Sequence, residues 1–297
     1  MILVQHLSKR FGRAHVLTGL DFAASAGERV ALVGQNGSGK TTFMRCLLGL
    51  YRYDGQITVG GHEPRTERSA LLEEVAFVPQ LPPAFRLTVG EYVELIEATC
   101  RVREERIFSL AHELGLDVEA ILDRPFPALS GGMKQKLLSA VAIARRPKLL
   151  VMDEPGANLD PTARRILYTQ LARLDDDTTM LLSSHRVDEL AGLVTRVVEL
   201  DGGRIVLDDV VARATELDSI AGSTQAFVEL MDAPASVSST LQEWGFVPTE
   251  GGWRGTVANP DRFRFLALMT RWSGLVRRFT FDDPRGPQGP GDDLSER

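Results

Sequence analysis

The stretch between residues 34 and 42 combines glycines, a lysine and hydroxyl side chains at a spacing that suits phosphate binding. It reads Gly34-Gln35-Asn36-Gly37-Ser38-Gly39-Lys40-Thr41-Thr42. Glycines let the backbone turn its N–H groups inward toward phosphate oxygens. Lys40 would place a positive charge on the β- and γ-phosphates of a nucleotide, and the Thr41 hydroxyl would hold Mg²⁺. The alternative is an ordinary glycine-rich turn between a strand and a helix.

Two carboxylates, Asp153 and Glu154, follow an apolar run that predicts a buried strand over Lys148–Met152. A buried strand with such an ending is expected where its tip meets a cation. Asp153 would hold Mg²⁺, directly or through water. Glu154 would act as general base toward an attacking water, a role that typically contributes about 10²- to 10⁴-fold to a rate. The competing interpretation is a solvated acidic pair at the start of a loop.

A second anion site is indicated at Ser130, Gly131 and Gly132. Ser130 is expected to cap a helix over Ser130–Arg145, and the two glycines leave backbone amides open at its positive end. Such a helix end attracts an anion without a charged side chain, although taken alone the sequence also suits an ordinary turn. One chain is not expected to fold so that both this turn and Lys40 reach the same nucleotide. Two subunits are therefore expected to enclose it.

The hydrophobic pattern over residues 1–215 predicts the elements that would position these side chains. Short apolar runs predict strands at Arg29–Val33, Glu74–Val78, Lys148–Met152, Thr178–Ser183 and Val197–Leu200. Several are apolar almost throughout, as is usual for parallel strands covered on both faces. Helices are predicted at Lys40–Leu50, Ser130–Arg145 and Pro161–Leu174, and Asp160 is a good cap for the last of them. Residues 84–128 read as a helical insertion, with helices at Thr88–Ala98 and Arg103–Leu114.

The composition changes after Arg213, and residues 220–283 are expected to form a second, small α+β domain. The pattern predicts, in order, a strand, a helix, two strands, a helix and a strand. Their ranges are Gln225–Met231, Ala235–Trp244, Phe246–Thr249, Trp253–Val257, Pro260–Trp272 and Leu275–Phe281. This order is that of a ferredoxin-like domain. Residues 284–297 are rich in proline and glycine and are expected to be a disordered tail.

Bulk composition limits the classes of function. The chain has 297 residues, of which 43% are hydrophobic and 25% charged, which is ordinary for a large globular domain with a smaller one. A net charge of −6 argues against a general nucleic-acid binder. Cys46 and Cys100 form no metal-ligand pattern. No window reaches the roughly 20 apolar residues of a membrane span.

Taken together and in this order, the motifs resemble those of the ATP-binding subunit of an ABC transporter over roughly residues 1–215. The matching segments are Gly34–Thr42 (Walker A), Val78-Pro79-Gln80 (Q-loop), Leu129–Gln135 (signature), Leu149–Glu154 (Walker B), Asn158-Leu159-Asp160 (D-loop) and Ser183-Ser184-His185 (switch). The resemblance implies an α/β fold, a P-loop ABC ATPase core with an antiparallel β subdomain. It also implies a helical subdomain at about residues 84–147.

The resemblance assigns roles that the residues alone do not. Phe11 would stack on adenine, a contact worth about 1–3 kcal/mol that is not selective enough to exclude GTP. Gln80 would reach the Mg²⁺ and sense a membrane partner. His185 would sense the γ-phosphate and hold Glu154 and the attacking water in place.

The family also implies that part of each site comes from a second subunit. The turn Ser130–Gly132 would meet the γ-phosphate bound by the partner. The carboxylate typical of the D-loop is present in this chain as Asp160. Residues Gly156–Asn158 depart from the common D-loop pattern, so the contact between subunits would differ there. No stretch before Ser130 resembles the one found in exporters with fused membrane domains, which favours a separate-subunit type similar to ABC-2 exporters.

These implications favour an ATP-hydrolysing subunit that energises transport, with export favoured over import. Its partners would be a second ATPase subunit, in a homodimer or heterodimer, and integral membrane permease subunits, whereas no nucleic acid is expected. The chain would lie in the cytoplasm, on the inner face of the cell membrane, through its permease. The alternative is a soluble ABC ATPase acting on ribosomes or nucleic acid, but such proteins usually carry two cassettes or a long inserted coiled coil. The small C-terminal domain would serve dimer contact or partner docking.

Overall fold

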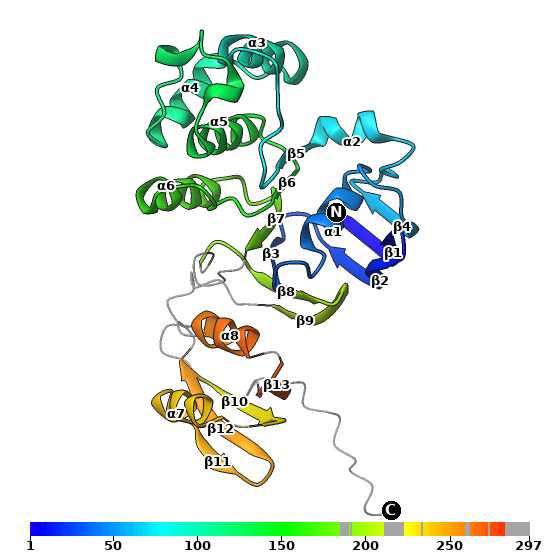
Figure 1. Cartoon of the computed structure of the whole chain (residues 1–297), viewed down its shortest axis with the longest axis vertical. Helices are drawn as coiled ribbons and strands as arrows, with labels where there is room; N and C mark the ends of the chain where they lie inside the picture. Colours follow the sequence, from blue (N-terminus) through cyan, green and yellow to red (C-terminus); the bar gives the residue numbers. More distant parts are fainter. Residues whose placement is uncertain are drawn as a thin grey trace, which may run out of the picture. The chain divides into compact units, whose positions relative to one another are not determined.

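A computed structural model describes residues 1–184, 190, 192–210, 223–232, 234–258, 262–272 and 274–282. The chain divides into two compact units, Met1–Ala212 and Arg213–Arg297. The first unit contains two sheets and a helical part, and the second contains one sheet with two helices (Figure 1). None of the helices in the described part of the chain combines the length and apolar character that crossing a bilayer requires.

An antiparallel sheet forms the N-terminal part of the first unit. Its order is β2-β1-β4, with β1 at Ile2–Phe11, β2 at Ala14–Ala24 and β4 at Asp54–Val59. A tight hairpin joins β1 to β2, and its last pair is Phe11 with Ala14. The aromatic ring of Phe11 is therefore fixed at the end of a paired strand.

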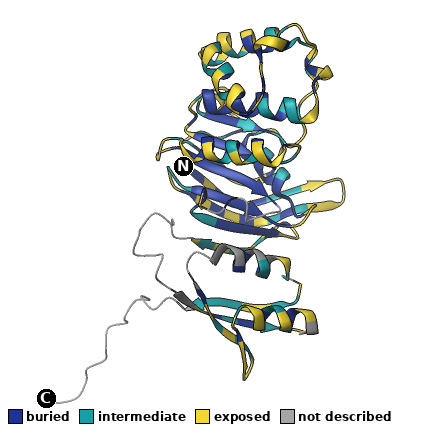
Figure 2. Cartoon of the chain, turned by 90° about the vertical axis from the view of Figure 1, so that its left-hand side faces the viewer, coloured by how far each residue is buried: buried dark blue, intermediate teal, exposed yellow. Residues whose placement is uncertain are grey.

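A six-stranded sheet carries most of the residues that sequence analysis singled out. Its order is β5-β6-β7-β3-β8-β9, with strands at Val75–Val78, Leu149–Met152, Thr179–Ser184, Arg29–Val33, Arg196–Asp201 and Arg204–Val210. All neighbours are parallel except β9, which is antiparallel to β8. Strands β3, β6 and β7 are buried throughout (Figure 2). Their carboxyl ends meet at one edge, where open α/β sheets bind ligands.

Helix α1, at Lys40–Leu47, ends three residues before the predicted Leu50. Gly49 has a φ of 65°, and its N–H donates to Cys46 O at 3.0 Å. The Leu50 N–H donates to Arg45 O at 2.9 Å. This pair of bonds is a Schellman ending, which favours glycine in the left-handed region. The glycine before Leu50 was therefore the signal for the true end of the helix.

The predicted helical insertion lies between β5 and β6. It contains α3 at Val89–Cys100, α4 at Glu104–Glu113 and α5 at Gly131–Ala144, with 3₁₀ turns at Glu119–Ile121 and Phe126–Ala128. A further short helix, α2 at Arg68–Glu74, precedes β5, and α6 at Pro161–Ala172 follows β6. Thr88 caps α3 in a reciprocal capping box with Glu91. Helix α3 therefore starts as expected but runs two residues beyond the predicted Ala98.

The second unit has the predicted order of strands and helices. The elements are β10 (Ser223–Leu230), α7 (Ala235–Glu243), β11 (Val247–Thr249), β12 (Gly252–Ala258), α8 (Arg262–Arg271) and β13 (Val276–Asp282). They form an antiparallel sheet in the order β11-β12-β10-β13. Trp244, Trp253 and Trp272 pack against its core around Phe265. The ferredoxin-like assignment stays a prediction, and residues 284–297 lie outside the described residues.

Candidate functional site

The glycine-rich loop connects β3 to α1 and is tightly enclosed. Gly34 has a φ of 143°, and a Cβ at this position would lie 2.2 Å from the carbonyl oxygen of Leu200. Only glycine therefore fits there. The Ser38 hydroxyl oxygen is buried and has no hydrogen-bond partner among the described residues. A buried hydroxyl of this kind is costly unless a ligand or water completes its hydrogen bonding.

Lys40 begins α1, and its ammonium group turns back over the loop. Nζ donates to the carbonyl oxygens of Gly34 at 2.7 Å and Gln35 at 3.1 Å. The pKa of Lys40 is lowered from its usual value, mainly because the side chain is buried. The charges of Glu154 and Asp153 act in the opposite direction. The side chain is only 6% exposed, so its charge is held close to the loop and to both carboxylates.

Asp153 is held from two sides by hydroxyl groups. Thr41 Oγ1 donates to Asp153 Oδ2 at 2.6 Å, and Ser183 Oγ donates to Asp153 Oδ1 at 2.6 Å. The Asp153 N–H donates to Val78 O at 2.9 Å, which ties the end of β6 to β5. Three strands and α1 thus fix the position of this carboxylate, which is 1% exposed.

Glu154 follows directly and adopts an unusual backbone conformation. Its φ is 52°, in the left-handed region that non-glycine residues rarely occupy. Its N–H donates to Ser183 Oγ at 2.8 Å, so one serine hydroxyl orients both neighbouring acidic residues. Strained backbone of this type persists where surrounding contacts hold it and is concentrated at functional sites.

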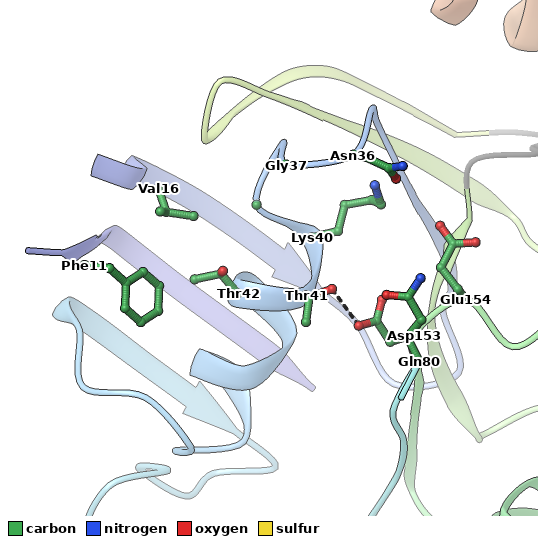
Figure 3. A pocket seen from close by; sticks show the side chains of 11 residues that line it. Phe11, Val16, Asn36, Gly37, Lys40, Thr41, Thr42, Gln80, Asp153 and Glu154 are labelled. Carbon is green, nitrogen blue, oxygen red and sulfur yellow. Dashed lines mark hydrogen bonds between the residues drawn. The ribbon is translucent and has the colours of Figure 1, made fainter. Parts of the chain in front are cut away.

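One pocket of about 600 Å³ gathers most of the predicted residues (Figure 3). Its lining consists of Phe11, Val16, Asn36, Gly37, Gly39, Lys40, Thr41, Thr42, Gln80, Asp153 and Glu154. Figure 3 shows Phe11 at one end, Glu154 at the other, and Lys40 and Thr41 between them. Gln80, which follows β5, lines the same pocket as Asp153. Gly34 and Ser38 belong to the same loop but do not line the pocket.

Phe11 has neighbours that sequence analysis did not identify. Its ring is 44% exposed and meets the Tyr51 ring edge-on, with the centroids 5.2 Å apart. Lys9 Nζ lies 4.5 Å from the centroid of the Phe11 ring. The Tyr51 hydroxyl accepts from Arg45 Nη1 at 2.6 Å. These contacts fix the plane of an exposed aromatic ring at the mouth of the pocket.

The turn at Ser130–Gly132 is not part of the pocket lining. The Ser130 hydroxyl caps α5 by accepting from the Met133 N–H at 3.2 Å. A Cβ at Gly132 would lie 2.8 Å from the carbonyl oxygen of Asn158, so glycine allows the start of α5 to approach this loop closely. Asp160 caps α6 through the Ala163 N–H at 2.9 Å, and this hydrogen bond is the main cause that lowers the pKa of Asp160.

His185 lies outside the described residues, so its predicted role has no structural counterpart here. Three residues that contribute to the site were not predicted. Val16 lines the pocket, Tyr51 contacts Phe11, and Ser183 joins Asp153 to Glu154. Of these, only Ser183 had a sequence signal, because it is a hydroxyl residue at the end of an apolar strand, next to the strand of Asp153.

Comparisons with known proteins agree on one family. A family model described as ABC transporter matches residues 17–157. The Nod factor export ATP-binding protein I of Ralstonia nicotianae is 35% identical over 219 residues, which cover 69% of this chain and 65% of the relative. The matched segment thus spans slightly under two thirds of that relative.

Two further comparisons cover more of the matched protein. The phosphonates import ATP-binding protein PhnC of Nocardia farcinica is 32% identical over 252 residues, which cover 78% of this chain and 93% of the relative. A solved structure titled as the ATP binding subunit of an ABC transporter aligns with a TM-score of 0.65 at 27% identity. That alignment covers 73% of this chain and 96% of the other.

Proposed function

The chain belongs to the ABC transporter family of ATP-binding proteins, and from this membership we propose that it hydrolyses ATP to drive transport through separate membrane-spanning subunits. The observation that carries the proposal is a series of hydrogen bonds next to the glycine-rich loop. It joins Thr41 to Asp153, Asp153 to Ser183, and Ser183 to the backbone of Glu154. Thr41, Asp153 and Glu154 line one pocket with Lys40, which supports a cation site beside a candidate general base. A site that only bound a nucleotide would not need the buried Glu154.

The residues present fit ATP with Mg²⁺. The amides around Gly37 and Gly39, which line the pocket, suit phosphate oxygens. The Thr41 hydroxyl, the Asp153 carboxylate and the Gln80 amide are hard oxygen donors, which Mg²⁺ prefers. Among the described residues, no group of three or more His, Cys, Asp or Glu side chains is arranged so that it could hold a metal ion. This small donor set suits Mg²⁺, which usually takes one or two carboxylates together with phosphates and water.

Each of these residues would then have a separate role in ATP hydrolysis. Lys40 would leave the carbonyl oxygens of Gly34 and Gln35 and place its charge on the phosphates. Glu154 would accept a proton from the attacking water at its carboxylate, with its position fixed by the Ser183 contact to its backbone. Bound Mg²⁺ would polarise the phosphates and stabilise their developing charge. Phe11 would stack on the base, with Val16 and Thr42 beside it in the lining.

The remaining predicted residues would act across a subunit boundary or on a partner. We assign Ser130, Gly131 and Gly132 to the nucleotide bound by a second copy, because they do not line the pocket of their own chain. Asp160 would support the same boundary, and His185 would sense the γ-phosphate.

The proposed partners are a second ATPase subunit, identical or paralogous, and permease subunits at the inner face of the membrane. Export is favoured by the name of the Ralstonia relative, whereas the Nocardia relative is named for import. The acidic net charge of −6 argues against the alternative of action on nucleic acid.

Replacing Glu154 with glutamine tests the proposal. The Glu154→Gln variant keeps the size of the side chain but cannot accept the proton, so ATP turnover is expected to fall by about tenfold or more while ATP binding is retained. A matched control is Glu119→Gln, at an exposed position in a 3₁₀ turn, which should leave turnover unchanged. Normal turnover in Glu154→Gln would show that the base assignment is wrong.

A further inference from the structure

The segment that follows Glu154 consists of two consecutive turns. The Glu154 carbonyl oxygen accepts from the Ala157 N–H at 2.9 Å, and the Gly156 carbonyl oxygen accepts from the Leu159 N–H at 3.4 Å. Proline suits the second position of the first turn, where Pro155 stands, because its ring fixes φ near −65°. Pro155 and Gly156 are both buried. The candidate base is therefore joined directly to a buried and hydrogen-bonded piece of backbone.

Helix α6 fills the space next to Gly156. A Cβ at this position would lie 2.7 Å from the Tyr168 hydroxyl oxygen and 3.1 Å from Arg164 Cδ. Tyr168 and Arg164 are four residues apart, so they lie on the same face of α6. The φ of Gly156 is outside the left-handed region, so the backbone conformation alone does not require glycine. Glycine is required here by the side chains of α6.

A second helix, α5, also holds this segment. Gln135 is fully buried, and its Nε2 donates to the carbonyl oxygen of Pro155 at 3.3 Å. The start of α5 approaches the carbonyl oxygen of Asn158 so closely that only glycine fits at position 132. On the α6 side, Arg164 Nη2 donates to the carbonyl oxygen of Leu159 at 3.2 Å. Because closely packed interiors transmit strain, a displacement at Gly156 is expected to reach Glu154.

The fit between Gly156 and Tyr168 involves a position where this chain departs from the common D-loop pattern. The Tyr168 hydroxyl occupies the space that a side chain at position 156 would fill. A large side chain on α6 is thus matched by the absence of one in the turn. Glu154, two residues earlier, is 8% exposed and has a φ of 52°, a strained conformation that its surroundings must maintain.

We propose that Tyr168 is a positioning residue for Glu154 and acts through its packing against Gly156. The inference rests on the proposed function, because it takes Glu154 as the general base. Tyr168 does not line the nucleotide pocket, so it has no direct part in binding ATP. It keeps the turn, and the carboxylate that precedes the turn, where a proton can be accepted from water. A shift of the base by about 1 Å is enough to slow such a reaction.

Adding one methyl group to the turn tests this role. In the full-length chain, Gly156→Ala is expected to lower kcat for ATP hydrolysis by about fivefold with little change in KM, because the pocket lining is untouched. In a Tyr168→Phe background, which lacks the hydroxyl group next to Gly156, the same change should lower kcat by less than about twofold. The matched control is Gly274→Ala, which should leave kcat unchanged because no atom lies within 4 Å of the added Cβ.

A Glu154→Gln background separates positioning of the base from a general effect on the fold. If Tyr168 acts through the base, Gly156→Ala should cause no further loss of the residual turnover once the base is absent. Tyr168→Leu removes the ring instead of adding a methyl group, and it should also lower kcat only when Glu154 is present. Tyr168→Leu gives the same comparison if thermal unfolding shows that Gly156→Ala has lost its fold.

Three results would overturn the proposal: an unchanged kcat in folded Gly156→Ala, an equal loss with and without the Tyr168 hydroxyl, or an equal loss with and without Glu154. If Gly156→Ala does not fold, an unchanged kcat in Tyr168→Leu, or an equal loss with and without Glu154, has the same meaning. The proposed function fails by a different result, because normal turnover in Glu154→Gln would show that the base assignment is wrong. If turnover falls in Glu154→Gln but not in folded Gly156→Ala, only the role of Tyr168 is rejected.

Discussion

The geometry around Asp153 depends on Ser183, which opens the predicted switch segment but to which the sequence assigned no role. Ser183 donates to the Asp153 carboxylate and accepts from the backbone N–H of Glu154, so its single hydroxyl fixes both acidic residues. Hydrogen bonds to a charged group contribute about 1.5–3 kcal/mol when they are buried. The strained φ of Glu154 is held by this contact. The placement of the candidate base is therefore coupled to the placement of the candidate cation ligand.

Removing this hydroxyl is expected to affect catalysis more than folding. In the Ser183→Ala variant, Asp153 keeps its contact with Thr41 but loses one of its two hydroxyl donors. We expect ATP turnover to fall by about tenfold and the Mg²⁺ concentration at half-maximal rate to rise. The control is Ser139→Ala, because Ser139 Oγ is buried in α5 and no residue in the described part of the chain forms a hydrogen bond with it. Equal turnover in the two variants would contradict the role of Ser183.

The Phe11 ring gives a second test at the residue scale. Tyr51 meets Phe11 edge-on, a contact worth about 0.5–1.5 kcal/mol. In Tyr51→Leu, we expect KM for ATP to rise by about two- to tenfold with little change in kcat, because only the orientation of the stacking ring is lost. Tyr51→Phe keeps the ring pair and should restore the wild-type KM. If Phe11→Ala had no effect on KM, base stacking itself would be wrong.

At the scale of elements, sequence patterns located the buried strands well. Strand β3 has the predicted bounds, β6 starts one residue later than predicted, and β7 is shifted by one residue at both ends. The agreement is close because parallel strands buried on both faces are apolar throughout. The bounds of β1 and β2 were not predicted. Their pairing contains register shifts, which disturb the alternation of buried and exposed side chains. Contacts such as those of Tyr51 and Ser183 could not be predicted either, since they join elements distant in sequence.

Strand β8 carries a buried carboxyl group that should make stability depend on pH. Burial raises the pKa of Glu199 to about 7, and the neighbouring Asp201 charge adds to this. Below the pKa of the unfolded chain, near 4.5, Glu199 is protonated in both states. As pH rises from there to 7, only the unfolded chain ionises, so the free energy of unfolding decreases.

The Glu199→Gln variant removes this titration. Relative to wild type, it should gain up to about 3 kcal/mol in stability between pH 4.5 and pH 8, as judged by unfolding midpoints of the first unit. The control Glu94→Gln, at an exposed position on α3, should show no such pH-dependent gain. If the free energy of unfolding of Glu199→Gln differed from that of wild type by the same amount at every pH in this range, Glu199 would not have a raised pKa.

At the scale of the whole molecule, the two units have separate hydrophobic cores. The core of the second unit contains Val228, Leu241 and Phe265, and its aromatic rings stack closely, with Phe246 and Phe265 centroids 4.8 Å apart. We propose that this unit serves dimer contact or partner docking, since no described residue of it lines the nucleotide pocket. Deletion of residues 216–297 should then weaken assembly while ATP binding by the first unit persists. Unchanged assembly and ATPase activity would refute this role.

The proposed site between two subunits can be tested by cross-linking. Asn36 lines the nucleotide pocket, whereas Ser130 does not, although both would face the same γ-phosphate if two copies enclosed one ATP. Two single variants, Asn36→Cys and Ser130→Cys, should therefore cross-link to each other when they are mixed. The background needs only Cys100→Ser, because Cys46 is buried and burial raises the pKa of its thiol to about 11, which leaves it unreactive.

We expect a short bis-maleimide to join the two variants only when Mg²⁺ and a non-hydrolysable ATP analogue are present, because nucleotide holds the subunits together. Each variant incubated alone reports cross-links between identical positions and is the control. Denaturing electrophoresis then separates the covalent dimer from the single chain. If the mixture gave no nucleotide-dependent dimer beyond these controls, Ser130 would not face the nucleotide of a second copy. The signature turn would then be only the cap of α5, which its contact with the Met133 N–H already explains.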